Sequence, residues 1–304
     1  MDLVTLEIFK AVAAELSITR AAALLGRVQS NVTTRVQQLE LELGVELFNR
    51  EGKKLKLSEQ GALFLSYANR LLALADEARQ ALHPTEPQGV LRLGSMESTA
   101  ATRLPLALSQ FHQQCPQVRL QVRTGPSQAL LGLLQTGEID CALVALPQDL
   151  DCTEVDYLTQ QGLMGEPAFA ETLRLVLPRG YTETDLGSGV SPLALAAFQS
   201  GCTYRSMAHG WLARRNPEAA LGLSVQEVGS YHAMLACVAA GQCFSFIPDA
   251  VLALSSAPGH VNPQVGIEST TWLVWRAGYS VASFQQAREC LCSTYTQHFP
   301  SSTR

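Results

Sequence analysis

Residues 17–44 read SITRAAALLGRVQSNVTTRVQQLELELG, and they contain two helical patterns separated by a glycine. Ser17 is a favoured helix N-cap and Gly26 a favoured helix end, which predicts a short helix between them. A second apolar stripe follows at helical spacing and ends before Gly44; its members are Val32, Val36, Leu39 and Leu43. Two short helices around a tight turn are typical of a helix-turn-helix.

The polar face of the second of these helices indicates a DNA-binding role. Asn, Thr, Arg and Gln side chains lie opposite its apolar stripe, and they can hydrogen-bond to base edges and phosphates. A polar face that only contacts water is the alternative. We expect contacts with double-stranded DNA from this helix and the one before it, through Arg20, Ser30, Asn31, Thr33, Thr34, Arg35 and Gln38.

The segment LFNREGKKLKLSEQG (47–61) contains two short extended pieces around a basic turn. A β-hairpin wing at this point would hold the DNA backbone without reading base sequence, through Arg50, Lys53, Lys54 and Lys56. Between residues 20 and 56, seven basic residues stand against four acidic ones, although the net charge of the whole chain is −5. This local positive excess favours a phosphate-containing partner.

One long helix is predicted from Ser58 to Leu82. One of its faces carries Ala62, Leu65, Ala68, Leu72, Ala75 and Arg79, with Leu63, Leu71, Leu74 and Leu82 beside it. That is more apolar surface than a lone helix leaves in water, so we expect it to pair with a second copy of the chain. Two prolines and a glycine in HPTEPQG (83–89) then end the helix and mark a linker.

Beyond the linker, strand-like and helical runs alternate, which predicts a parallel α/β fold. Strands are expected at 90–94, 118–125, 141–146, 173–178, 243–248 and 270–276, and helices at 99–114, 127–137, 192–199, 207–215, 230–241 and 282–297. This part of the chain is long for one small sheet, so two subdomains with a cleft between them are expected.

The composition is that of an ordinary soluble globular protein, with 47% hydrophobic and 16% charged residues. No apolar run reaches the roughly 18–20 residues that span a bilayer, and no signal sequence begins the chain, so we expect a cytoplasmic protein without a membrane partner. The eight cysteines form no CxxC pair and the histidines are scattered, so no metal and no cofactor are predicted. Reduced thiols are expected; a redox switch through Cys202, Cys237 or Cys243 is the alternative.

The order of these segments resembles the LysR-type transcriptional regulators over the whole chain. The most specific stretches are FKAVAAELSITRAAALL (9–25), VQSNVTTRVQQLELELGVELFNR (28–50) and KLSEQG (56–61). The family's small hydroxylated cap before the recognition helix is Val28 here, so we expect Ser30 to act as the cap and the helix to start later. The family's early wing arginine is absent, and Lys53 and Lys54 are expected to substitute for it.

Within that family, the second half resembles the putrescine-utilisation regulators. The similar segments are GSMESTAATRLP (94–105), TGPS (124–127), GCTYR (201–205), SYHAMLACVAAG (230–241) and TTWLVWR (270–276). This likeness implies control of genes for the catabolism of putrescine, 4-aminobutyrate or related amines and glutamate.

The resemblance also implies an architecture: an α/β protein with an N-terminal all-α winged helix-turn-helix, a long linker helix and a bilobed effector domain like a periplasmic binding protein. The expected parts are residues 1–58 for DNA binding, 59–83 for dimerisation, 84–89 as linker and 90–304 for effector binding, with lobes at about 90–162 plus 266–304 and 163–265. The implied partners are promoter DNA, a small effector (an amine, amino acid or carboxylate) and further copies, in a homodimer or homotetramer through the linker helix.

The effector is expected between the lobes, where strand C-termini and helix N-termini meet. The implied contacts are Ser95, Met96, Glu97, Ser98, Thr99, Thr124, Gly125, Pro126, Ser127, Cys202, Tyr204, Arg205, Tyr231, His232, Phe246 and Pro248. Arg205 suits a carboxylate bidentately, unless an acidic side chain of the protein occupies it. Ser127 suits a helix cap or a ligand hydroxyl contact, and His232 a charge sensor or a helix N-terminal hydrogen bond.

Glu97 is the unexpected residue of the segment GSMESTAATRLP. A strand that runs into a helix normally forms a socket for an anion, yet Glu97 is itself an anion. Two interpretations follow. Either the helix N-terminus stabilises its carboxylate, or the carboxylate binds the amine end of an effector whose acid end Arg205 takes.

An enzyme is the main competing class. The α/β part contains Ser, His and Asp, but no GxSxG, GxGxxG or P-loop motif is present, so no catalytic residue is predicted. A DNA-binding module fused to an α/β enzyme domain is therefore the alternative function.

Overall fold

The computed structural model describes the chain except for residues 52–53, 83–85, 149, 187–192, 256–259 and 299–304, and except for the side chains of residues 50, 260 and 293–298. The chain forms two compact units. The first contains residues 1–83 with 136–138, and the second contains residues 84–135 and 139–304.

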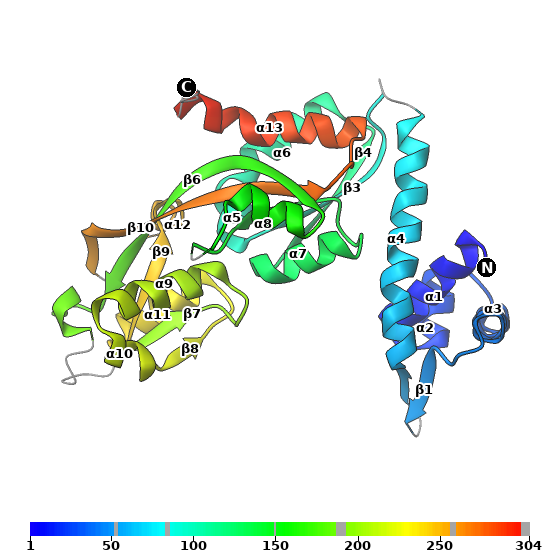
Figure 1. Cartoon of the computed structure of the whole chain (residues 1–304), viewed down its shortest axis with the longest axis horizontal. Helices are drawn as coiled ribbons and strands as arrows, with labels where there is room; N and C mark the ends of the chain where they lie inside the picture. The colour runs from blue at the N-terminus through cyan, green and yellow to red at the C-terminus, as the bar shows by residue number, and fades with distance from the viewer. Residues whose placement is uncertain (52–53, 83–85, 149, 187–192, 256–259, 299–304) are drawn as a thin grey trace. The chain divides into compact units, whose positions relative to one another are not determined.

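The first unit is a three-helix module with a β-hairpin and a long helix (Figure 1). Its elements are α1 (Leu3–Glu15), α2 (Ile18–Leu24), α3 (Gln29–Leu43), β1 (Phe48–Glu51), β2 (Lys54–Leu57) and α4 (Glu59–Ala81). The expected cap at Ser17 is confirmed, because its side chain accepts a hydrogen bond from the Arg20 N–H. The two strands pair antiparallel, as expected of a wing.

The start of α3 differs from the prediction. The helix begins at Gln29 and Val28 is its N-cap, in an extended conformation and without a capping side-chain hydrogen bond. The expectation that Ser30 caps the helix was wrong, because Ser30 already lies inside its first turn. The earlier start leaves first-turn N–H groups without a side-chain acceptor, and such groups favour an anion.

Phe9 lies at the centre of the first unit and joins α1 to the wing and to α4. Its ring centroid is 5.5 Å from that of Phe48 and 5.2 Å from that of Phe64. The α4 residues in the same core are Phe64, Leu65, Ala68 and Leu72. Most of the leucine face that was expected to pair with a second copy is therefore used within the unit.

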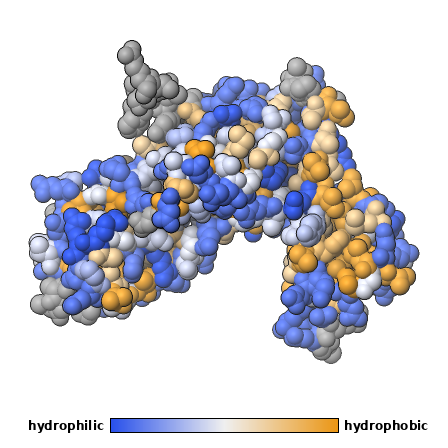
Figure 2. All heavy atoms as spheres, in the orientation of Figure 1, coloured by the Kyte–Doolittle hydropathy of each residue, from blue (hydrophilic) through white to orange (hydrophobic). Residues whose placement is uncertain are grey.

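A neighbouring stripe of α4 stays exposed instead. Leu63 is 63% exposed and Leu74 is 60% exposed, and Tyr67 and Leu71 lie between them on the same side of the helix. Figure 2 shows this apolar surface along α4. Leu63, Leu71 and Leu74 belong to the apolar surface that the sequence assigned to pairing, whereas Leu65, Ala68 and Leu72 of that surface pack within the unit.

The second unit is built on an eight-stranded mixed sheet in the order β4-β3-β5-β10-β6-β9-β7-β8. Its strands are β3 (Gly89–Ser95), β4 (Val118–Thr124), β5 (Cys141–Ala145), β6 (Leu163–Leu177), β7 (Ala194–Ala197), β8 (Val225–Glu227), β9 (Cys243–Pro248) and β10 (His260–Arg276). Strands β3–β5 are parallel to one another, as are β7–β9, but β6 and β10 pair antiparallel with each other and with their neighbours.

The prediction of a wholly parallel sheet was thus wrong for two strands. β6 and β10 are 15 and 17 residues long, and they run antiparallel through both halves of the unit. Residues 194–197 also form a strand where a helix was expected over 192–199. Residue 192 lies outside the described residues. A short, fully apolar run carries no periodicity that separates a buried strand from a helix.

Helices cover both faces of this sheet in two lobes (Figure 1). The first lobe, with β3–β5, contains α5 (Glu97–Thr102), α6 (Leu104–Gln114), α7 (Ser127–Gln135), α8 (Glu154–Gln160) and α13 (Ala282–His298). The second lobe, with β7–β9, contains α9 (Thr203–Arg215), α10 (Pro217–Leu221), α11 (Tyr231–Ala239) and α12 (Asp249–Leu252), preceded by a 3₁₀ turn, Glu183–Asp185. Each lobe has one apolar core on each face of the sheet.

The two lobes touch along one side of the sheet. The Thr203 hydroxyl at the start of α9 donates to the Ala145 carbonyl at the end of β5, at 2.9 Å. The Gln128 N–H donates to the Gly201 carbonyl at 3.4 Å. Within the described part of the chain, no helix has the length and apolarity needed to span a membrane.

Candidate functional site

The outer face of α3 presents four of the predicted DNA contacts to solvent. Ser30, Asn31, Thr34 and Gln38 are exposed, whereas Val32, Val36 and Leu39 on the opposite side are buried. Thr33 is half-buried, and its hydroxyl donates to the Gln29 carbonyl at 3.0 Å. The exposed set is therefore uncharged and rich in hydrogen-bonding groups, which suits base edges in a major groove.

Arg35 does not belong to this exposed set. Its guanidinium Nη1 lies 3.3 Å from the Asp2 carboxylate and 3.4 Å from the Thr5 hydroxyl, so it ties α3 to the start of α1. The N–H and hydroxyl of Thr5, followed by the charge of Arg35, lower the pKa of Asp2. A partner at the N-terminus of the chain, more than thirty positions away, was not visible from helical spacing.

Basic side chains around α3 come from the preceding helix and from the wing. Arg20 is exposed, and its Nε forms an ion pair with Glu15 at 3.0 Å. Lys54 is exposed on β2, and Lys56 pairs with Glu51 at 2.5 Å. Lys53 and the side chain of Arg50 lie outside the described residues.

Arg27 is a basic residue at this surface that the site prediction omitted. It is exposed in the turn between α2 and α3, next to the uncapped start of α3. Arg27 is one of the seven basic residues counted between positions 20 and 56. Helical periodicity could not select it as a DNA contact, because it lies in a turn.

A cleft of about 580 Å³ lies between the two lobes of the second unit. Ten of the predicted effector residues line it, namely Met96, Glu97, Ser98, Thr124, Gly125, Pro126, Ser127, Cys202, Tyr204 and Tyr231. The sequence prediction missed Phe198, Gln199, Glu227, Val228 and Gly229. Phe198 and Gln199 follow β7, and Glu227 ends β8 and is followed by Val228 and Gly229; both of those strands were absent from the predicted topology.

The topology explains why these residues meet. β3 runs into α5, β4 into α7, β7 into α9 and β8 into α11, so the lining residues stand at the carboxyl ends of parallel strands. Such ends form the binding crevice of open α/β sheets. Ser127 is buried there, and its hydroxyl accepts a hydrogen bond from the Ala145 N–H at 3.2 Å.

Six predicted effector residues do not line the cleft. Ser95 and Thr99 are buried, and the Ser95 hydroxyl donates to the Met96 carbonyl. Phe246 packs against Trp211 with 5.0 Å between the ring centroids, and Pro248 ends β9 in the sheet. Arg205 and His232 complete the set: Arg205 lies behind the lining, and His232 is exposed at the start of α11.

Arg205 is held by an acidic side chain of the protein. Its Nη1 lies 2.6 Å from the Glu227 carboxylate and donates to the Phe198 carbonyl at 3.3 Å. Of the two roles that the sequence left open, the structural ion pair is the one observed. The carboxylate that holds Arg205 itself lines the cleft.

Glu97 is the first residue of α5, and its carboxylate is half-buried. Its Oε2 atom is enclosed and has no hydrogen-bond partner. Burial raises the pKa of Glu97, and the charge of His232 partly opposes that rise. Among the described residues no backbone N–H bonds to this carboxylate, so the helix N-terminus does not satisfy it directly.

Three aromatic side chains share the cleft with Glu97. The rings of Phe198 and Tyr231 meet edge to face at 5.0 Å. Tyr204 is 6% exposed, and its hydroxyl has no hydrogen-bond partner. Burial raises the pKa of Tyr204 and of Tyr231, so both hydroxyls stay neutral and can donate hydrogen bonds.

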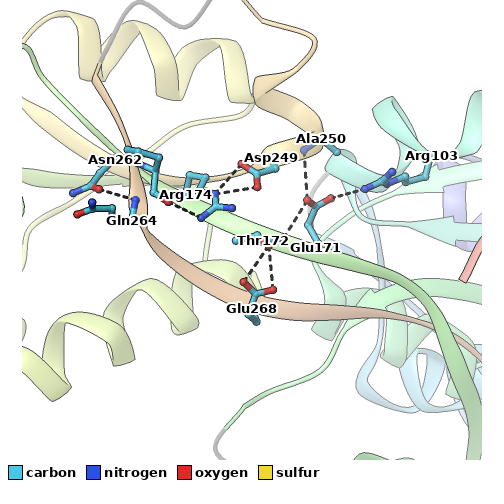
Figure 3. A network of polar contacts seen from close by, with 10 residues as sticks. Arg103, Glu171, Thr172, Arg174, Asp249, Ala250, Asn262, Gln264 and Glu268 are labelled. Carbon is cyan, nitrogen blue, oxygen red and sulfur yellow. Dashed lines mark hydrogen bonds and ion pairs between the residues drawn. The ribbon is translucent and has the colours of Figure 1, made fainter. Parts of the chain in front are cut away.

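A polar network joins the lobes beside the cleft (Figure 3). Glu171 on β6 lies 3.6 Å from Arg103 of the first lobe and accepts a hydrogen bond from the Ala250 N–H of the second, at 3.4 Å. Arg174 pairs with Asp249 at 3.0 Å along the same strand. Because Glu97 begins α5 and Arg103 follows its end, this one helix connects the cleft to the junction between the lobes.

No group of three His, Cys, Asp or Glu side chains within the described residues could hold a metal ion. All eight cysteines are free thiols in the structure. Burial raises the pKa of Cys202 at the cleft, and the neighbouring backbone N–H groups partly oppose that rise.

Comparison with known proteins identifies both units. Residues 3–62 match the bacterial regulatory helix-turn-helix protein, lysR family, and residues 84–293 match the LysR substrate binding domain. The HTH-type transcriptional regulator YusT of Bacillus subtilis (strain 168) is 35% identical over 261 residues, covering 84% of this chain and 82% of YusT. GltR of the same organism is 30% identical over 263 residues, covering 86% of this chain and 84% of GltR.

Solved structures show the same fold. A full-length variant of OxyR from Pseudomonas aeruginosa superposes with a TM-score of 0.66 at 23% identity, covering 97% of this chain and 95% of that one. CbnR in complex with its target DNA gives a TM-score of 0.62 at 21% identity, covering 96% and 99%. Because family models match both units and the relatives are matched over most of their length, the chain belongs to the LysR family of transcriptional regulators, with a DNA-binding and an effector-binding domain, and it is not an enzyme.

Proposed function

We propose that this regulator reads promoter DNA with α3 and the β1–β2 wing, and that a small metabolite bound between the lobes changes that binding. The observation that carries the proposal is the cleft of about 580 Å³ lined from both lobes, in a chain that also has an exposed polar recognition helix. A ligand that contacts both lobes binds one arrangement of the lobes better than others, and that difference in affinity drives the response.

The proposal divides the chain as the family resemblance implies. Residues 1–58 contact DNA, 59–83 pair two copies, 84–89 link, and 90–304 bind the effector with lobes at about 90–162 plus 266–304 and 163–265. The exposed apolar stripe of α4 supports pairing, because Leu63, Tyr67, Leu71 and Leu74 have no cover within their own unit. Two such pairs would make a homotetramer.

The DNA-binding part is tested by Gln38→Ala. Gln38 is exposed on α3 and contributes nothing to the core, so the variant should fold normally. We expect its affinity for the native promoter fragment to fall roughly 5- to 150-fold, which corresponds to about 1–3 kcal/mol for a bidentate base contact. Fluorescence anisotropy measures the affinity, and Gln110→Ala, exposed on α6, is the matched control. Unchanged binding by Gln38→Ala would remove α3 from the reading surface.

We further propose that the regulated genes serve putrescine, 4-aminobutyrate or related amine and glutamate catabolism. The likeness of segments 94–105, 124–127, 201–205, 230–241 and 270–276 to the putrescine-utilisation regulators supports this. Footprinting on promoters of such genes from the host, with promoters of unrelated operons as controls, tests the assignment. Equal protection of both groups of promoters would contradict it.

A further inference from the structure

We propose that the effector must carry a positively charged amino group, for which Glu97 is the counter-ion, and that it needs no carboxylate. This inference rests on the proposed effector role of the cleft and names the class of ligand. It replaces the two-ended site expected from the sequence, in which Arg205 took the acid end of the same molecule.

The charges that line the cleft are of one sign. Among its described lining residues only Glu97 and Glu227 are charged, and both are acidic. Arg205, the cation that the sequence placed at this site, lies outside the lining and is engaged by Glu227 at 2.6 Å. Since Arg205 pairs with Glu227, a dicarboxylate would enter against the unpaired charge of Glu97, whereas a cation is attracted to it.

Glu97 needs a partner that the chain does not supply. Its enclosed Oε2 atom has no hydrogen-bond donor, and a buried carboxylate without a partner is costly. The charge of His232 lowers the pKa of Glu97, but the two side chains form no ion pair within 4.0 Å. An ammonium group supplies the missing donors and the opposite charge together.

The remaining walls of the cleft also suit a cation. Phe198, Tyr204 and Tyr231 line it, and aromatic rings attract ammonium groups through their negative faces. Tyr204 is 6% exposed, and its hydroxyl, close to the side chains of Ser98 and Thr271, adds a neutral polar group to this wall. A carboxylate and several rings around one enclosed space are the elements of amine recognition.

Helix N-termini at the cleft act in the opposite direction, but more weakly. α5, α7, α9 and α11 all begin there, and each helix start carries roughly half a positive charge. The start of α11 is already satisfied by the Ser230 side chain, which accepts from the Ala233 N–H at 3.2 Å. Glu97 itself stands at the start of α5, so the starts of α7 and α9 remain, and a ligand carboxylate is tolerated there but not required.

Matched ligands on the full-length protein test the inference. One set has four carbons: butane-1,4-diamine, 4-aminobutyrate and succinate. The other is aromatic: 2-phenylethylamine and 3-phenylpropanoate. We expect calorimetric binding and a rise in melting temperature with members that carry an ammonium group, and neither with succinate or 3-phenylpropanoate. Failure of every amine in both sets, or binding of succinate or 3-phenylpropanoate without the amines, would overturn the inference.

The decisive variant is Glu97→Gln, with Glu154→Gln on α8 as the matched exposed control. We expect Glu97→Gln to weaken amine binding at least about tenfold, because a charge-assisted hydrogen bond is lost. The melting temperature of the ligand-free variant should not fall, since the substitution removes a half-buried charge whose enclosed Oε2 atom has no hydrogen-bond partner. Undiminished amine binding by Glu97→Gln would show that this carboxylate is not the counter-ion.

Promoter binding without ligand distinguishes a failure of the proposed regulator function from a failure of the amine specificity. Wild type and the control Glu154→Gln should bind the promoter fragment equally, since Glu154 does not line the cleft and is in the other unit from α3. A chain that binds the amines but not DNA would contradict the proposed function and leave the inference standing. A chain that binds DNA and prefers succinate would contradict the inference alone.

Discussion

Gly61 shows how a single missing side chain fixes the junction between the wing and α4. A Cβ atom at this position would lie 2.0 Å from the Leu47 carbonyl oxygen, which is backbone and cannot move aside. Ser58 stabilises the same corner, because its N–H donates to the Leu47 carbonyl and its hydroxyl accepts from the Gly61 N–H at 2.8 Å. The glycine in the family motif is therefore required by close backbone approach.

Gly61→Ala is expected to destabilise the protein by about 1–3 kcal/mol, the usual cost of forcing extra volume into a packed site. Gly132→Ala is the matched control, because Gly132 is also helical and nothing lies within 4 Å of its added Cβ. The control should be stabilising by roughly 0.5–1 kcal/mol, since alanine favours helix. Urea unfolding measures both, and equal effects would refute the steric explanation.

Two of the arginines assigned binding roles from the sequence, Arg35 for DNA and Arg205 for the effector, share one property. Arg35 is paired with Asp2 and Arg205 with Glu227, so in both cases an acidic side chain of the chain occupies the guanidinium. A sequence shows the chemical type of a residue, but it does not show which distant side chain already forms an ion pair with it. Glu97 is the opposite case, because its carboxylate is suited to bind a ligand and its Oε2 atom has no hydrogen-bond partner in the chain.

At the scale of elements, α4 divides its apolar residues between two neighbouring sides. Ala68 and Leu72 pack on the first unit, while Leu63, Leu71 and Leu74 stay in solvent. An exposed leucine stripe of this kind is typical of a helix that pairs with another copy.

Leu71→Glu is expected to weaken self-association, raising the dimer dissociation constant by at least about tenfold, because the charge would be buried in an apolar contact. Sedimentation equilibrium measures the constant. Leu221→Glu on α10 is the control, since Leu221 is 91% exposed and lies on another unit. A Leu71→Glu protein that associates like wild type would mean that α4 does not pair copies.

A second element-scale contact ties α13 to the long strand β6. The Arg288 guanidinium binds the Glu166 carboxylate through two hydrogen bonds, and both side chains are partly exposed. Burial alone would raise the pKa of Glu166, but its hydrogen bonds with Arg288 and Cys292 outweigh that effect and lower it. A carboxyl group with a lowered folded-state pKa stabilises the fold above its unfolded pKa and loses that contribution as the pH falls.

Glu166→Gln should therefore cost about 1 kcal/mol of stability at pH 7, where a partly exposed pair contributes modestly. The difference from wild type should shrink as the pH falls from 4.5, the ordinary value for glutamate, through the lowered folded pKa. Urea unfolding at several pH values measures this difference, with Glu154→Gln as the exposed control. A difference that grows in acid would contradict the ion-pair account.

At the scale of the whole molecule, β6 and β10 make one sheet out of two lobes. They pair along almost their full length, from Leu163 with Arg276 to Leu177 with His260. The network around Glu171 lies on β6 where the lobes meet, and α5 carries the cleft residue Glu97 at its start and precedes Arg103 of that network. A ligand held by Glu97 thus acts on the helix that also contacts the junction.

DNA binding by the full chain should depend steeply on salt, because phosphate contacts release counter-ions. Lys54→Ala is expected to reduce the slope of log affinity against log salt by about 1, since one exposed cation of the wing is removed. Arg179→Ala, exposed in the effector domain, should leave the slope unchanged. Anisotropy titrations between low and physiological salt measure the slopes, and equal slopes for wild type and Lys54→Ala would exclude Lys54 as a phosphate contact.

The sequence alone determined the order of the modules, the helices α1–α4, the wing, most strands of the first lobe and ten of the cleft residues. The helices, wing and strands follow from short-range signals, namely caps at Ser17 and Ser58 and apolar periodicity, whereas the cleft residues were implied by the family resemblance. Only the tertiary structure decided the antiparallel course of β6 and β10, the strand over 194–197 and the side of α4 that stays exposed. It also decided that Arg205 is occupied and Glu97 is not, because the partners of a charge come from distant positions that no local pattern encodes.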